Sequence, residues 1–129
     1  MTRAEMGKSQ LDELNVALGV VANLLESHRF AEVLEFSREK ISTAKRVLGS
    51  HHETTLELQR HNVMALFLLE DVVDPSKTWE EEKVEAFQMI EELYRSFQEH
   101  LGATHPATMR CAGLRRDGRR LLKGRGLLK

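Results

Sequence analysis

The sequence predicts an all-α fold built from antiparallel helix–turn–helix repeats. Apolar residues recur at steps of three and four along four long segments, which is the periodicity of an amphipathic helix. Glycines and helix-capping residues lie between these segments, where helices end and begin. Residues 48–56 read Leu-Gly-Ser-His-His-Glu-Thr-Thr-Leu, and residues 101–109 read Leu-Gly-Ala-Thr-His-Pro-Ala-Thr-Met. Because this similarity recurs at a spacing of about fifty residues, it predicts an α-solenoid of about two to two and a half units.

The first repeat is expected at residues 9–49. Residues 1–8 are polar and lack apolar periodicity, so we expect a flexible N-terminus there. Ser9 is a good N-cap for a helix whose apolar residues recur through residues 11–25. Residues 27–29 are enough only for a tight turn before a second apolar-periodic helix. A connection this short makes two helices antiparallel neighbours.

The second repeat is expected at residues 50–102. Ser50 and Glu53 have the spacing of a capping box, so we expect a helix to begin here. The helix is expected to give way to an inserted loop at residues 71–78. Pro75 prevents a continuous helix through this loop, because proline has no N–H to donate and its ring clashes with the preceding turn.

A longer helix is expected after the loop. Thr78 and Glu81 repeat the capping-box spacing, and apolar residues continue at helical steps as far as Leu101. The acidic run at residues 80–82 falls in the first turn, where negative charge favours the helix dipole. We therefore expect these three carboxylates on a solvated helix end.

The C-terminal segment has weaker helical features. Pro106 suits the first turn of a helix, and residues 103–122 are expected to form a partial third repeat or capping helix. The apolar stripe of this segment is interrupted, and Gly118 and Gly124 each lower helix stability by about 1 kcal/mol relative to Ala. The remaining residues 123–129 are expected to form a basic tail.

Charge is unevenly distributed along the chain. The formal net charge is −1, but residues 110–129 hold eight Lys or Arg and one acid, a net of +7. Residues 1–109 hold eleven basic and nineteen acidic groups, a net of −8. Such asymmetry indicates a basic interaction segment at one end of the chain.

The composition predicts one globular domain. The chain has 129 residues, 41% of them apolar and 30% charged, which is enough apolar material for a core and enough charge for a soluble surface. No apolar run approaches the length of a membrane span, and no secretory leader pattern opens the chain. The single cysteine, Cys111, cannot form an internal disulfide, so we expect a reducing, cytoplasmic location.

The second copy of the repeated segment carries the pattern Leu-Gly-x-x-His-Pro-x-Thr and resembles the linker of tetratricopeptide repeats of the kinesin light chain type. Residues 28–33, His-Arg-Phe-Ala-Glu-Val, look like that family's Gly-x-Tyr-x-x-Ala turn. The resemblance covers most of residues 14–109. This chain departs from the family at His28, at Val33 and in the absence of proline from the first linker. The resemblance implies a helical solenoid that binds a peptide or a helical segment of a partner protein.

Patterns for catalysis, metal binding or phosphate binding are missing from the sequence. His52 and His61 are nine positions apart, which places them on opposite sides of a helix and excludes a shared metal site. Cys111 has no base at a recognisable spacing, and no glycine-rich phosphate loop follows a strand. We therefore expect no enzymatic activity, no metal and no cofactor.

A non-catalytic protein-interaction module is the leading functional hypothesis. Stacked helix pairs form a concave surface that the first helix of each pair lines. The candidate contact residues are the polar residues of those helices, namely Asn15, Asn23, Gln59, Arg60 and Asn62.

Two further partner hypotheses remain open. One is binding of nucleic acid or an anionic surface through residues 110–129, although the segment has no aromatic residue for base stacking and makes nucleic acid an unfavoured partner. The other is self-association, or a place in a longer repeat array, because two repeats form only a short surface.

Overall fold

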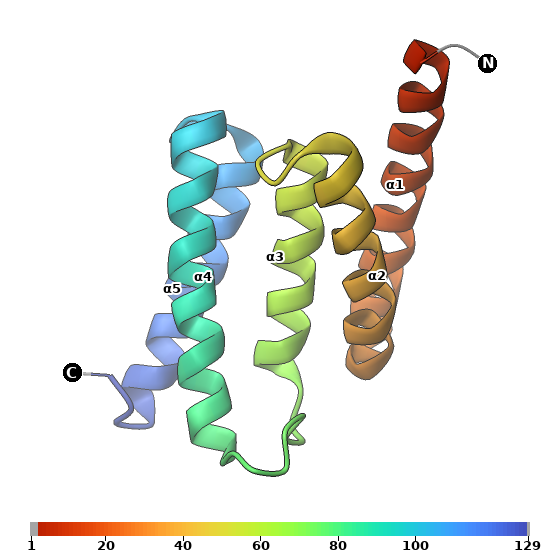
Figure 1. The fold of residues 1–129 in the computed structure, drawn as a ribbon. Coiled ribbons are helices and arrows are strands. Elements are labelled where there is room, and N and C mark those ends of the chain that lie inside the picture. Colours follow the sequence, from red (N-terminus) through yellow and green to blue (C-terminus); the bar gives the residue numbers. More distant parts are fainter. Residues whose placement is uncertain (1–2, 129) are drawn as a thin grey trace.

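The computed structural model describes the backbone of residues 3–128 and the side chains of residues 7–128. It is all-α, as the sequence predicts, with no strand among the described residues (Figure 1). The five helices are α1 (Arg3–Glu26), α2 (Phe30–Leu48), α3 (Glu53–Leu68), α4 (Trp79–Leu101) and α5 (Pro106–Gly124).

Helix α3 occupies the centre of the molecule. It packs against each of the other four helices, and consecutive helices also pack against each other as antiparallel neighbours. Helices α1 and α5 lie at opposite ends of the arrangement and do not contact each other (Figure 1). The order of packing along the molecule therefore follows the order of the helices in the sequence.

Helix α1 begins earlier than the sequence indicated. It starts at Arg3, so Ser9 lies inside the helix and most of the segment expected to be flexible is helical; residues 1–2 lie outside the described part. Alanine, glutamate, methionine, lysine and glutamine in residues 4–10 are strong helix formers, and they extend the helix without a cap at Ser9. The buried side of α1 consists of Leu14, Ala17 and Val21.

The turn between α1 and α2 is closed by a Schellman motif. His28 has a φ of 57°, in the left-handed region that favours glycine. The Arg29 N–H donates to the Leu24 carbonyl at 2.9 Å, and the His28 N–H donates to the Leu25 carbonyl at 3.0 Å. The chain therefore uses histidine at a position where this kind of turn favours glycine.

The two repeated linkers have the same geometry. Gly49 and Gly102 have φ values of 96° and 94°, and His52 and His105 follow as the N-caps of α3 and α5. In each linker the histidine Nδ1 accepts a hydrogen bond of 3.1 Å from the backbone N–H two residues ahead. The prediction that Ser50 caps α3 is wrong. His52 is the N-cap of α3, and its ring accepts the hydrogen bond from the Thr54 N–H.

Three hydrophobic clusters form the core, and α3 contributes to all of them. Leu58 and Ala65 pack with residues of α1 and α2, and Val63 and Phe67 pack with α4 and the C-terminal half of α5. Leu56 packs with the end of α4 and the start of α5. Because α3 is surrounded on most sides, its buried residues do not form the single stripe that a surface helix shows.

The loop at residues 69–78 is fastened by adjacent residues of α4. The Glu82 carboxylate accepts from the Val73 and Asp74 N–H groups at 2.8 Å, and its side chain is buried. The Lys83 ammonium donates to the Leu66 carbonyl at 2.6 Å and also to that of Leu69, and so caps the end of α3. The expectation of a solvated acidic run is therefore wrong for Glu82, because the loop folds back over this carboxylate.

Helix α4 starts with the predicted cap. The Thr78 hydroxyl accepts from the Glu81 N–H at 3.1 Å, and the Glu81 carboxylate accepts from the same hydroxyl at 3.2 Å. The Glu81 carboxylate therefore bonds to the Thr78 hydroxyl and not to the Thr78 backbone N–H, as it would in a capping box. The start of α4 at Trp79 agrees with the sequence-based prediction.

Helix α5 is longer and better packed than the sequence indicated. It runs to Gly124, and its buried side is made largely of small residues: Ala107, Thr108, Cys111 and Gly118, followed by Leu122. The segment expected to be only a tail turns back, because the Leu127 N–H donates to the Leu122 carbonyl at 2.9 Å. Leu127 and Leu128 pack against the cluster that contains Phe67 and Phe87.

Gly118 marks the closest approach of α5 to the core. A Cβ atom at this position would lie 3.2 Å from the Phe87 ring and 3.4 Å from the Phe67 ring. We expect Gly118→Leu to lower the free energy of unfolding by about 1–3 kcal/mol through overpacking, despite the better helix propensity of leucine. At Gly113 a Cβ would meet only an Arg116 nitrogen at 3.9 Å, so Gly113→Leu is the matched control. Urea melts of both variants test this, and equal midpoints would contradict the close approach.

Candidate protein-interaction groove

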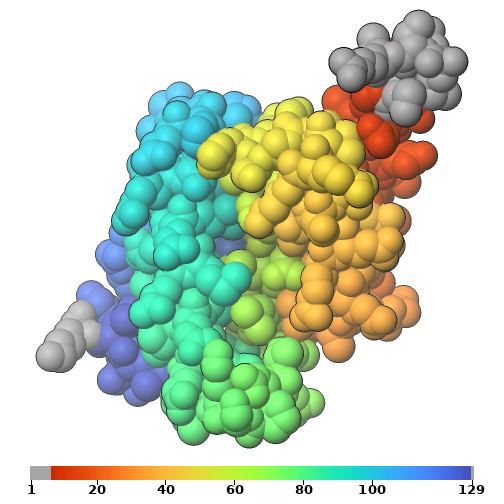
Figure 2. All heavy atoms as spheres, viewed as in Figure 1, coloured from red at the N-terminus to blue at the C-terminus, as the bar shows by residue number. Residues whose placement is uncertain are grey.

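A groove runs between α2 and α4, with α3 as its floor. Two hollows of about 350 and 340 Å³ adjoin one another and share the lining residues Ile41, Asn62 and Met89. A third hollow shares Leu34, Arg38 and Val73 with the first, and so extends the depression over α2 to the loop after α3. Figure 2 shows the recess between α2 (orange) and α4 (green to cyan). We call this depression the α2–α4 groove.

The α2–α4 groove combines an apolar lining with polar groups. Met89 projects into it from α4 with 43% of its surface exposed, which is high for a large apolar side chain. Its other apolar lining residues are Leu34, Ile41, Val63, Leu66, Val73 and Leu93. Its polar lining residues include Arg38, Gln59, Asn62, Glu85, Glu92 and Ser96. Apolar surface with a few polar groups is typical of a binding surface.

The floor of the groove is held by a hydrogen bond between helices. The Asn62 amide nitrogen donates to the Ser37 hydroxyl at 2.7 Å, and Ser37 is fully buried where α2 and α3 meet. The Asn62 amide oxygen accepts no hydrogen bond from another described residue. That oxygen is therefore an acceptor that a bound segment can use.

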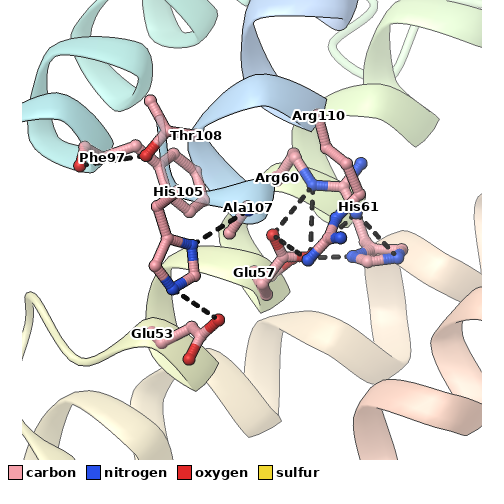
Figure 3. A network of polar contacts seen from close by, with 9 residues as sticks. All are labelled: Glu53, Glu57, Arg60, His61, Phe97, His105, Ala107, Thr108 and Arg110. Carbon is pink, nitrogen blue, oxygen red and sulfur yellow. Dashed lines mark hydrogen bonds and ion pairs between the residues drawn. The ribbon is translucent and has the colours of Figure 1, made fainter. Parts of the chain in front are cut away.

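A separate polar network lies on the other side of α3, which we call the Glu57 network (Figure 3). Residues 57, 60 and 61 point away from residues 59, 62 and 66, because successive helical residues turn by about 100°. The Glu57 carboxylate accepts from Arg60 at 2.8 Å, and both side chains are buried. Arg110 of α5 approaches the same carboxylate at 3.5 Å. This network joins α3 to α5 and is already satisfied within the fold.

His61 completes the Glu57 network as a neutral imidazole. Its Nδ1 lies 2.7 Å from the Glu57 carbonyl oxygen, so Nδ1 carries the hydrogen and donates it. Its Nε2 then has a lone pair and lies 3.5 Å from an Arg60 nitrogen that can donate to it. Burial, together with the positive charge of Arg60, lowers the pKa of His61.

We expect the stability of the protein to fall as the pH drops below about 6.5, partly because of His61. The unfolded chain takes up a proton at the ordinary histidine pKa, whereas the folded protein does so only at a lower pH. The stabilisation that neutral His61 gives to the folded protein is therefore present above about pH 6.5 and is lost on acidification. Thermal melts at pH 7.5 and 5.5 should differ less in His61→Gln than in the wild type. His28→Gln is the control, because His28 is exposed. An equal reduction of the difference between the two melts in this variant would contradict the assignment to His61.

The five candidate contact residues do not gather at one site. Gln59 and Asn62 both line the α2–α4 groove. Asn15 accepts from the Thr54 hydroxyl at 3.0 Å between α1 and α3, and Arg60 belongs to the Glu57 network. Asn23 is exposed on α1. Sequence reasoning missed Arg38 and Met89, although a methionine outside the apolar stripe of the amphipathic helix α4 was a usable signal.

The basic C-terminal helix has part of its charge neutralised within the fold. Arg115 and Arg119 both pair with Glu91 of α4, at 2.8 and 3.2 Å. Among the described side chains, those of residues 7–128, no carboxylate pairs with Arg120 or Lys123. The positive charge available to a partner therefore comes mainly from the outer side of α5.

The remaining sequence features give no chemical site in the described part of the chain. Cys111 is buried, and burial raises the pKa of its thiol to about 12, so it stays protonated at neutral pH. Among the residues described, no three His, Cys, Asp or Glu side chains gather as metal ligands. None of the described helices combines the length and the apolar character needed to cross a membrane.

Comparison with known proteins gives no match to a family model, to a characterised protein or to a solved structure.

Proposed function

We propose that this protein is a non-catalytic interaction module of the tetratricopeptide kind, which binds a peptide or helical segment of a partner protein in the α2–α4 groove. The observation that carries the proposal is the groove itself, which is continuous, largely apolar and open to solvent at Met89. The role we propose for such a surface is that of a scaffold or adaptor.

The arrangement of the helices supports the assignment to tetratricopeptide-like units. Helices α1 and α2 form one pair, α3 and α4 a second, and α5 opens a partial third. The first helices of successive pairs contact each other, α1 with α3 and α3 with α5. The same glycine conformation and histidine cap recur where each new pair begins. These features support stacked units that are joined by linkers of the same geometry.

The dimensions of the groove suit a short amphipathic segment. Its lining residues on α4 run from Glu82 to Ser96, which corresponds to roughly 20 Å at 1.5 Å per residue. A helix or extended peptide of that length can place apolar side chains against Ile41 and Met89. Its polar groups can pair with Gln59 and with the free oxygen of Asn62.

Selection from a displayed library of random peptides tests the proposal. Peptides enriched on the wild type should lose affinity by at least ~10-fold, about 1.4 kcal/mol, on Met89→Lys. Met109→Lys is the matched control, because Met109 is an exposed methionine on α5 that does not line the groove. Absence of enriched peptides, or an equal loss in the two variants, would contradict binding in the groove.

Binding of nucleic acid or an anionic surface through residues 110–129 is the alternative. It is less well supported, since Arg110, Arg115 and Arg119 already face carboxylates of α3 and α4. A salt-sensitive mobility shift with single-stranded RNA, abolished by Arg116→Glu and Arg120→Glu together, would favour this alternative over the groove.

A further inference from the structure

The outer face of α1 is apolar and acidic. Val16 is 69% exposed and Val20 is 40% exposed, although valine is usually buried in a helical protein. Asp12 and Glu13 lie one turn before Val16 and are exposed, and the exposed Lys8 lies one turn before Asp12. This side of α1 points away from Leu14, Ala17 and Val21, which pack on the core. We call it the α1 end face.

The outer face of α5 is apolar and basic. Met109 is 62% exposed, and Arg116, Arg120 and Lys123 are exposed at helical spacing on the same side of the helix. Gly113 lies between Met109 and Arg116 on this side. Within the described residues neither Arg120 nor Lys123 has a carboxylate partner. We call this the α5 end face.

The two end faces are complementary and point in opposite directions. Helices α1 and α5 stand at opposite ends of the molecule, so one copy cannot bring its own two faces together (Figure 1). Residues 1–26, which include α1, hold four acidic and two basic groups, a net of −2, whereas residues 110–129 have a net charge of +7. Each face also has exposed apolar side chains, Val16 and Val20 on one and Met109 on the other.

We propose that the protein self-associates head-to-tail, with the α5 end face of one copy docked on the α1 end face of a second copy. An antiparallel alignment that places Asp12 opposite Arg120 also places Gly19 opposite Gly113. A Cβ on Gly19 would meet no atom within 4 Å, and one on Gly113 would meet only the flexible end of Arg116. The two helices can therefore approach closely where the glycines face each other.

A second copy fits these faces better than an unrelated anionic ligand. Nucleic acid would use the basic face but would leave Val16 and Val20 exposed on the other end. Self-docking covers the apolar residues of both faces and pairs charges of opposite sign. Because the contact uses two different surfaces, it does not close on itself and extends into chains of copies. The contact is independent of the α2–α4 groove.

Sedimentation velocity of the full chain at low and high salt tests the contact. We expect the weight-average sedimentation coefficient to rise with protein concentration at low salt, and this rise to shrink in 0.5 M NaCl because salt screens exposed charges. Asp12→Arg and Arg120→Asp should each weaken association by at least ~10-fold. An equimolar mixture of the two variants should restore association, because each mutated face then meets an opposite charge.

Gly19→Arg separates loss of docking from loss of folding. The site is open, so the variant should melt at or above the wild-type temperature and yet remain monomeric. A wild type that stays monomeric at all concentrations and salts would overturn the proposal. Association that persists in Asp12→Arg and Arg120→Asp, or a mixture of them that fails to recover, would overturn it too. A shift of single-stranded RNA by a monomeric wild type would assign the α5 end face to nucleic acid instead.

Discussion

Replacement of Ile90 by Ala is expected to lower the free energy of unfolding by about 2–5 kcal/mol. Ile90 has no exposed surface and belongs to the cluster with Val63, Phe67 and Phe87, which joins α3, α4 and α5. Removing its side chain deletes buried methyl and methylene groups and leaves a cavity that the surrounding helices fill only in part. Chemical denaturation followed by circular dichroism measures the change.

The neighbouring methionine provides the control. Met89 precedes Ile90 on α4 but faces the groove and is 43% exposed, so Met89→Ala should change stability by well under half as much. Leu101→Ala should also have a smaller effect than Ile90→Ala, because Leu101 is only half-buried at the end of α4. Equal losses for Ile90 and Met89 would show that α4 is rotated about its axis relative to the structure.

Glu57→Gln is expected to destabilise the protein by about 3–5 kcal/mol, because it leaves the buried guanidinium of Arg60 without a compensating charge. The side chains of Arg60 and Glu57 are only 8% and 6% exposed, and their closest atoms are 2.8 Å apart. Replacing both residues with Met should recover much of the loss, since no buried charge remains. Thermal and urea melts of the single and double variants form the measurement.

The chain contains its own control for this pair. Arg29 and Glu32 are also three residues apart and form an ion pair, but their side chains are 55% and 52% exposed. Solvent screens such a pair, so Glu32→Gln should change stability by no more than about 1 kcal/mol. A similar effect at both positions would mean that the Glu57 pair is hydrated in solution, against its position in the core.

All five helices were predictable from the sequence, but the buried side was predictable only for helices with a single buried stripe. Helices α2 and α4 each face the core on one side, so their apolar residues recur at simple steps. Helix α3 is enclosed by four neighbours and buries Glu57, Arg60 and His61 together, which periodicity alone assigns to solvent. Helix α5 packs with alanine, threonine and glycine, whose small size conceals a buried stripe.

The helix caps show the same limit of prediction from sequence, here at the level of single atoms. The pattern of Ser50 and Glu53 satisfied the rule for a capping box, but His52 supplies the accepting atom. The pattern of Thr78 and Glu81 satisfied the same rule and forms the cap. Both positions have the right residue types, so only the course of the backbone decides between them.

The position of the groove was not predictable from the sequence. Gln59 and Asn62, two of the five candidate contact residues, line it from α3. Its walls come from the second helices α2 and α4, whereas the sequence-based hypothesis placed the binding surface on the first helices. The difference arises because α2 and α4 do not pack on each other, and the surface of α3 between them stays accessible.

The central position of α3 also determines how the protein unfolds. Repeat proteins can often lose one terminal unit while the rest stays folded, because each unit contacts only its neighbours. Here every hydrophobic cluster includes α3, so neither helix pair keeps a complete core without it. Amide hydrogens of α3 should exchange with solvent only when the whole chain unfolds, whereas those near the ends of α1 and α5 can exchange through local fraying. The protein should therefore unfold as one cooperative unit, with a rigid groove floor between more mobile ends.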